Sequence, residues 1–83
     1  MRRKIAKRKR REVLKRAKII SEGWEREGCL KRKDCCYCAE IECNGWKICV
    51  PEYDELEVWK AALECIEFAE EEPFEEWKRR KGV

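Results

Sequence analysis

A chain of 83 residues has room for one small domain, which buries a modest share of its surface, so we expect a metal, disulfides or a partner to stabilise it. The chain is 43% hydrophobic with four tryptophans, which argues against disorder, and its mean hydropathy of −0.86 argues against a membrane protein. The net charge of +3 hides a strong separation, because residues 2–20 hold eleven Lys or Arg and one acid, whereas residues 52–76 hold eleven Asp or Glu and one Lys.

The N-terminal segment predicts a long helix from Arg2 to about Glu27. No proline occurs in it, and apolar residues recur at spacings of three and four over its second half. This stripe consists of Val13, Leu14, Ala17, Ile20 and Trp24. The first half offers little to a core, so we expect residues 1–12 to form a basic helical arm that projects from a single domain of residues 13–83.

The dipeptide Asn44-Gly45 predicts a β-hairpin between strands at about 38–43 and 46–50, because these residues tolerate the positive φ angles of a type I′ turn. A loop of two residues fixes the register of the strands. It pairs Cys43 with Trp46, Glu42 with Lys47, Ile41 with Ile48, Glu40 with Cys49, and Ala39 with Val50.

Side chains alternate between the two faces of a strand, so this register separates an apolar face from a hydrated one. The apolar face carries Ala39, Ile41, Cys43, Trp46, Ile48 and Val50. The hydrated face carries Cys38, Glu40, Glu42, Lys47 and Cys49. We therefore expect the apolar face to pack on helices, and Cys38 and Cys49 to be diagonal neighbours on the other face.

Two further helices follow the hairpin. Residues 52–71 have a broad apolar face, and Pro51 and the acids after it suit the first turn of a helix. Pro73 opens a short helix at about 73–80, with acids in its first turn and cations in its last. The predicted fold is α+β, with a long basic helix, a central two-stranded hairpin and two C-terminal helices.

Five of the seven cysteines lie in or next to the hairpin, which favours a metal site. A structural Zn²⁺ takes four ligands in a tetrahedron, and in a chain without histidine these must be thiolates. We predict zinc bound by Cys35, Cys38, Cys49 and Cys29, with Cys36 as the alternative fourth ligand. An iron–sulfur cluster could use the same thiolates.

The Cys-x2-Cys step, the hairpin and the following helix resemble, over residues 35–60, the treble-clef group of zinc modules. In that group the start of the helix supplies two ligands, whereas this chain has Cys49 there and no second cysteine within a turn. Disulfides are the rival interpretation, for example between Cys43 and Cys65 at core-facing positions. In a third interpretation these two cysteines are small buried hydrophobic residues.

The basic segment predicts binding to DNA or RNA through phosphates, because neutralising phosphates releases counterions and relieves the repulsion among eight cations in residues 2–11. The predicted contacts are Arg2, Arg3, Lys4, Lys7, Arg8, Lys9, Arg10, Arg11, Lys15, Lys31, Arg32 and Lys33, with Arg79 to Lys81 as a further candidate. The acidic segment should face away from the nucleic acid. We place Trp24, Trp46 and Trp59 in the core rather than against bases.

Two alternatives to nucleic acid stay open, and an anionic membrane surface is disfavoured because residues 2–11 contain almost no large apolar side chains. The basic helix could pair with the acidic one, within one chain or between two, or it could contact another protein. No catalytic constellation is evident, since the chain has no histidine, one serine and no glycine-rich phosphate loop. The leading hypothesis is a non-enzymatic, zinc-stabilised nucleic-acid-binding protein. The alternative is a disulfide-bonded adaptor that dimerises through its oppositely charged helices.

The composition also bears on the cellular setting. No apolar run resembles a signal peptide, so we expect an intracellular protein. Dense Lys, Arg and Glu without His resembles the composition of thermophile proteins, and intracellular disulfides are common in such cells. A basic arm on a small cysteine-containing domain resembles, in layout, small ribosome-associated proteins and small regulators of archaea and their viruses.

Overall fold

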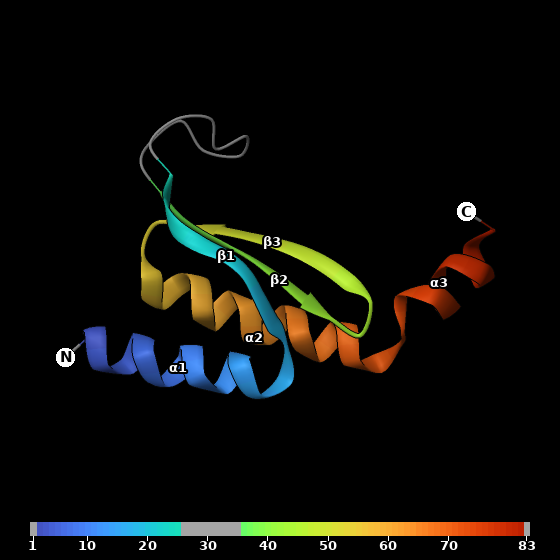
Figure 1. The fold of residues 1–83 in the computed structure, drawn as a ribbon, viewed down its shortest axis with the longest axis horizontal. Helices are drawn as coiled ribbons and strands as arrows, with labels where there is room; N and C mark the ends of the chain where they lie inside the picture. The colour runs from blue at the N-terminus through green and yellow to red at the C-terminus, as the bar shows by residue number, and fades with distance from the viewer. Residues whose placement is uncertain (1, 26–35, 83) are drawn as a thin grey trace.

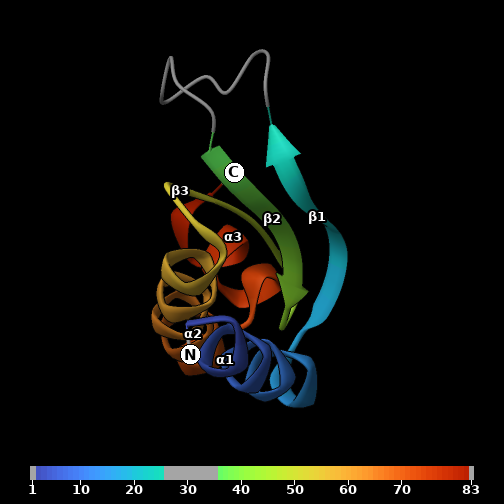
Figure 2. The same cartoon turned by 90° about the vertical axis from the view of Figure 1, so that its left-hand side faces the viewer.

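The computed structural model describes residues 2–25 and 36–82. The elements in chain order are α1 (Arg2–Arg16), β1 (Lys18–Glu25), β2 (Cys36–Cys43), β3 (Trp46–Glu52), α2 (Glu55–Glu71) and α3 (Phe74–Lys81). The strands form one antiparallel sheet in the order β1-β2-β3. Helices α1 and α2 lie side by side on one face of this sheet, and α3 extends beyond the turn of the hairpin (Figures 1 and 2). The predicted α+β class is confirmed.

The predicted hairpin and its register are confirmed between β2 and β3. Asn44 and Gly45 have φ angles of 54° and 87°, as a type I′ turn requires. Strand β3 continues through Pro51, which stands opposite Cys38. Because β3 is an edge strand, a proline can omit its N–H there without breaking the ladder. The following helix therefore begins at Glu55 rather than at residue 52.

The predicted helix from Arg2 to Glu27 is wrong after Arg16, because residues 18–25 form β1 and pair with β2. The sheet thus has three strands instead of the expected two. The apolar spacing that suggested a helix does not correspond to one face of this strand. A β-bulge lies between Ile19 and Ser21, so Ile19, opposite Ile41, and Glu22, opposite Ala39, share one face. Ile20, which the predicted helical stripe included, is 42% exposed.

The core lies between the sheet and the two helices, and α2 supplies most of its helical part. Six side chains of α2 are buried, whereas α1 buries only Ala6 and Val13. The buried residues of α2 are Leu56, Val58, Trp59, Ala62, Ile66 and Ala69. From the sheet come Tyr37, Ala39, Ile41, Cys43 and Val50, so the apolar face of the hairpin packs on the helices as predicted.

Helix α1 follows α2 along its length, and both helices run in the same direction (Figure 1). Arg2 bonds to Asp54 before the first turn of α2, and Arg16 bonds to Glu70 in its last turn. Ala6 is only 2% exposed. Residues 2–12 therefore do not project from the core as an arm but form part of α1.

The turn of the hairpin is fixed against the end of α2 and the start of α3. The side-chain amide of Asn44 donates to the carbonyl of Ala69 at 2.9 Å. The backbone carbonyl of Asn44 accepts from the backbone N–H of Phe74 at 3.1 Å. The indole of Trp46 donates to the carbonyl of Glu72 at 2.8 Å. Trp46, Phe74 and Trp77 form an aromatic cluster with centroid distances of 5.0–5.9 Å. These contacts set the position of α3.

Candidate nucleic-acid interface

Helix α1 turns two small apolar residues to the core and a row of cations to solvent. Ala6 and Val13 are seven residues apart, about two turns, so both face the sheet and α2. The opposite side of the helix carries five exposed cations at spacings of three and four residues. We call Lys4, Lys7, Arg8, Arg11 and Lys15 the basic stripe.

The basic stripe is a dense row of positive charge. From Lys4 to Lys15 it extends about 16 Å, or about one charge per 4 Å, at about 1.5 Å per residue. Within the described ranges, none of the five side chains forms an ion pair. The stripe is therefore available to an external polyanion.

Three other cations of α1 are held by carboxylates of the same molecule. The pairs are Arg2 with Asp54, Arg10 with Glu22, and Arg16 with Glu70. They lie on the flanks of α1 that face α2 and β1. Arg2 and Arg10, which we predicted as phosphate contacts, therefore bind carboxylates within the protein. The cations of α1 thus form an inner set, which is paired, and an outer set, which is the basic stripe.

The paired carboxylates on α2 stay ionised at neutral pH. The backbone N–H of Glu57 donates to the N-cap Asp54 at 2.9 Å and, with a contribution from Arg2, lowers the pKa of that carboxyl. The hydrogen bond from Arg16 lowers the pKa of Glu70 in the same way. These acids neutralise the inner flank of α1 and leave the basic stripe unchanged.

The remaining predicted phosphate contacts occupy different positions. Lys9 is partly buried on the side of α1 that also carries Arg2 and Arg16, and Arg3 is exposed outside the stripe. Arg80, in the last turn of α3, bonds to Glu72 at 2.7 Å, and this hydrogen bond lowers the pKa of Glu72. Helix α3 lies at the opposite end of the molecule from the first turn of α1 (Figure 1). The basic triplet at residues 31–33 lies outside the described residues.

A chain of aromatic contacts leads from the core to the surface beside α1. Trp59 is fully buried, and the guanidinium of Arg10 lies 5.9 Å from its ring centroid. Tyr37 packs edge-on against Trp59 at 6.3 Å and against Trp24 at 5.3 Å. Burial, followed by the charges of Glu55 and Glu22, raises the pKa of Tyr37.

Trp24 ends this chain of contacts at the surface. Its side chain is 57% exposed, so the prediction that it lies in the core is wrong, whereas that for Trp59 is confirmed. Sequence periodicity missed this because it assigned Trp24 to a helix, while it stands near the end of the edge strand β1. Trp24 could have been predicted at the surface only if residues 18–25 had been assigned to a strand.

The structure places two of the four predicted zinc ligands. Cys38 of β2 stands opposite Pro51, and Cys49 of β3 stands opposite Glu40. The two cysteines are therefore diagonal neighbours on the open face of the sheet, as predicted. Cys29 and Cys35 lie outside the described ranges, and the alternative ligand Cys36 is located only as the first residue of β2. Among the described residues no group of three or more candidate ligands is found.

Cys43 fits the interpretation as a small buried hydrophobic residue. It is 5% exposed and carries a free thiol, so the disulfide with Cys65 considered above is not formed. Its thiol donates to the carbonyl of Arg16 at 3.5 Å, at the end of α1, and burial raises its pKa. Cys43 thus joins the hairpin to α1.

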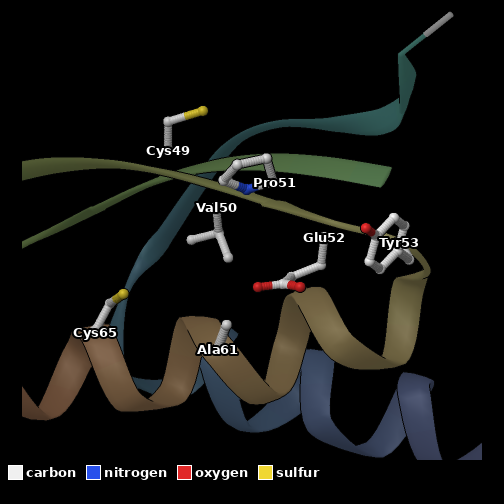
Figure 3. Close-up of a pocket in the computed structure, with 7 residues that line it drawn as sticks. All are labelled: Cys49, Val50, Pro51, Glu52, Tyr53, Ala61 and Cys65. Atoms are coloured by element: carbon white, nitrogen blue, oxygen red, sulfur yellow. The ribbon is translucent and has the colours of Figure 1, made fainter. Parts of the chain in front are cut away.

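A groove lies between the edge strand β3 and α2 (Figure 3). This groove has a volume of about 480 Å³ and is lined by Cys49, Val50, Pro51, Glu52, Tyr53, Ala61 and Cys65. Val50 and Glu52 point toward α2, whereas Cys49 points away from it (Figure 3). Since no Lys or Arg lines the groove, it does not extend the basic stripe.

The helices in the described part of the chain were tested for membrane spans, and none is both long and apolar enough to cross a bilayer. Comparison with known proteins gave no relationship that would identify a function. No family model matches the chain, and neither curated proteins nor solved structures yielded a match.

Proposed function

We propose that this protein is a non-enzymatic nucleic-acid-binding protein that contacts phosphates through the basic stripe of α1. The observation that carries the proposal is the division of the cations of α1 into two sets. The inner set is paired with Asp54, Glu22 and Glu70, whereas the five residues of the stripe are exposed and form no ion pair with the described residues. Phosphates would supply the anions with which these five cations can pair.

Repulsion within the stripe supports an external anion as the binding partner. Lys4, Arg8, Arg11 and Lys15 follow one another at steps of three or four residues, and like charges at these spacings destabilise a helix. Glu12 is the sole acid of α1. A row of phosphates would replace this repulsion with attraction and release condensed counterions, which gives an affinity that falls steeply with salt.

A matched pair of triple variants tests the proposal. In the first variant Lys4, Arg8 and Arg11 are replaced by Gln. In the control Lys47, Lys60 and Lys78 are replaced by Gln, which removes the same charge from β3, α2 and α3. Affinity for a fluorescent 20-base-pair DNA duplex and for an RNA hairpin is measured by anisotropy over 50–300 mM salt.

The stripe variant is expected to reduce the slope of log affinity against log salt by about one unit per lost contact, and the control by less than one unit in total. Neither variant should unfold, because all six side chains are exposed. Equal losses in the two variants would mean that net charge alone matters. Wild-type binding that is weaker than micromolar at 50 mM salt, or that does not fall with salt, would overturn the proposal.

The zinc-stabilised form of the proposal concerns Cys38 and Cys49, together with Cys29 and Cys35. Diagonal neighbours on a hydrated sheet face suit thiolate ligation, and removal of the ion should then lower the melting temperature. Native mass spectrometry distinguishes the outcomes. Bound zinc adds the mass of the ion with loss of protons from its thiol ligands, and each disulfide removes two hydrogen atoms. A fully reduced, metal-free mass would reject both.

A second candidate function, a protein adaptor that forms a homodimer, is favoured by the opposite charges of the two adjacent helices. The outward side of α2 carries Glu57, Glu64, Glu67 and Glu71 beside the basic stripe. A two-fold axis parallel to the helices would place each α1 on the α2 of a second copy. Such a dimer would be detected by analytical ultracentrifugation at low salt, and the stripe variant should dissociate it.

A further inference from the structure

Packing of the core does not explain why a tryptophan near the end of β1 is exposed. Trp24 is 57% exposed, whereas the other ring-bearing members of its aromatic chain, Tyr37 and Trp59, are 8% and 0% exposed. Trp24 stands opposite Tyr37 across the sheet, so both rings lie on the face that carries the helices. The exposed ring therefore lies on the face of the sheet that carries the helices, not on the open face.

The ring of Trp24 is held in place by the core. Tyr37 packs edge-to-face on it with an interplanar angle of 87°, and Tyr37 in turn packs on the buried Trp59. A ring supported in this way loses little conformational entropy when a ligand stacks on it. Trp24 is therefore a rigid platform rather than a mobile surface side chain.

An ion pair on the strand of Trp24 reduces the negative charge near the ring and connects this strand to α1. Glu22, two residues earlier on the same face of β1, has its carboxylate bonded through both oxygens to Arg10 at 2.8 and 3.1 Å. This pair neutralises that carboxylate and connects β1 to α1. Arg10 itself is one turn from Lys7 of the basic stripe. Arg10 and Lys7 thus connect the basic stripe to the strand that carries Trp24.

We propose that Trp24 stacks on an unpaired base of a nucleic acid whose phosphates lie on the basic stripe, so that the preferred target contains single-stranded nucleotides. This inference rests on the proposed function and specifies its substrate class. Bases in a duplex are stacked on one another and offer no free face, whereas unpaired bases stack readily on aromatic side chains. Stacking depends on the π-face that every base has, so little base preference is expected.

The test compares 12-nucleotide oligothymidine and oligouridine with a 12-base-pair DNA duplex at 100 mM salt. The variants are Trp24→Ala, Trp24→Phe, Trp24→Leu and a control, Phe68→Ala, which removes an exposed ring from the acidic helix α2. Trp24→Leu keeps apolar bulk against Tyr37 without a stacking ring. It therefore preserves the test if Trp24→Ala does not fold.

Trp24→Ala and Trp24→Leu are expected to weaken single-strand binding about 10-fold or more and to leave duplex binding within about 2-fold. Trp24→Phe should restore most of the affinity, and Phe68→Ala should change neither. Single-strand binding that is unchanged in the Ala and Leu variants, or equally weakened for duplex, overturns the inference while the proposed function stands. Wild-type protein that binds none of the three probes overturns both. A preference of the wild type for oligothymidine or oligouridine over the duplex supports the inference, and a preference for the duplex overturns it.

Discussion

Helices α1 and α2 lie side by side and parallel, yet they differ in almost every physical property. Helix α2 buries six side chains, two of them the large residues Trp59 and Ile66, while α1 buries one alanine and one valine. Helix α1 carries ten Lys or Arg and one Glu, and α2 carries six Glu and one Lys. One helix stabilises the fold mainly through apolar contacts, and the other lies against it mainly through small side chains and ion pairs.

This difference indicates a division of roles. Burying apolar surface is the main source of stability, so α2 and the hairpin should account for most of it. Because α1 contributes little to the core, its outward residues are free to serve binding. Changes on α2 should therefore unfold the protein, whereas changes on the outward side of α1 should alter binding at constant stability.

The largest expected effect tests this contrast directly. Ile66→Ala in α2 should reduce the free energy of unfolding by about 2–5 kcal/mol, because it removes a fully buried side chain and leaves a cavity. Val13→Ala in α1 removes fewer buried atoms and should cost about 2 kcal/mol. Urea unfolding followed by circular dichroism measures both. Equal losses, or a larger loss for Val13, would contradict the assignment of stability to α2.

The second prediction concerns the C-terminal end of α2, where Asn44 of the hairpin turn donates a hydrogen bond to the carbonyl of Ala69. Asn44→Ala should cost about 2–3 kcal/mol, because alanine is strained at a φ of 54° and the hydrogen bond to Ala69 is lost. Asn44→Gly relieves the strain and should cost about 1 kcal/mol, from the hydrogen bond. A glycine variant as unstable as the alanine variant would show that backbone strain is not involved.

The third prediction concerns Asp54, which caps α2 and bonds to Arg2 of α1. Asp54→Ala should cost about 1 kcal/mol at pH 7, and Asp54→Asn less, since asparagine keeps the cap. The pKa of Asp54 is lowered in the folded protein, so its charge stabilises above the unfolded value of about 4 and is lost as pH falls through the lower folded value. Melting curves from pH 7 to pH 2 should therefore show wild type and Asp54→Asn converging in acid. A constant difference would exclude a role for the charge.

The smallest effects are expected from the ion pairs that join α1 to its neighbours. Arg10→Gln should cost about 1 kcal/mol, because Arg10 also lies over the ring of Trp59, and Arg16→Gln should cost less, since exposed pairs contribute little. Thermal unfolding at 50 mM and 500 mM salt measures both, and the effect of Arg16→Gln should shrink with salt. A loss for Arg16→Gln as large as that for Val13→Ala would mean that ion pairs, not Ala6 and Val13, hold α1 in place.

Sequence reasoning succeeded where one residue pair or one face determines the structure locally. Asn44-Gly45 fixed the register of the hairpin, and the periodicity of α2 identified its buried face. It failed at residues 18–25, because Ala17, Ile20 and Trp24 recur at helical spacing although Ile20 and Trp24 lie in a bulged strand. That error also placed Trp24 in the core. It had no effect on the cations of α1, whose helical spacing holds from Arg2 to Arg16.

The sequence by itself determined the turn, the pairing of the hairpin, the two C-terminal helices and the concentration of cations at the N-terminus, since each depends on neighbours in the chain. Only the tertiary structure decided that β1 completes the sheet, that α1 lies along α2, and which cations remain exposed. The physical reason is that strand pairing and ion pairing join residues far apart in sequence, such as Arg16 and Glu70. The local sequence pattern does not indicate which of several possible distant partners a strand or a charged side chain will pair with.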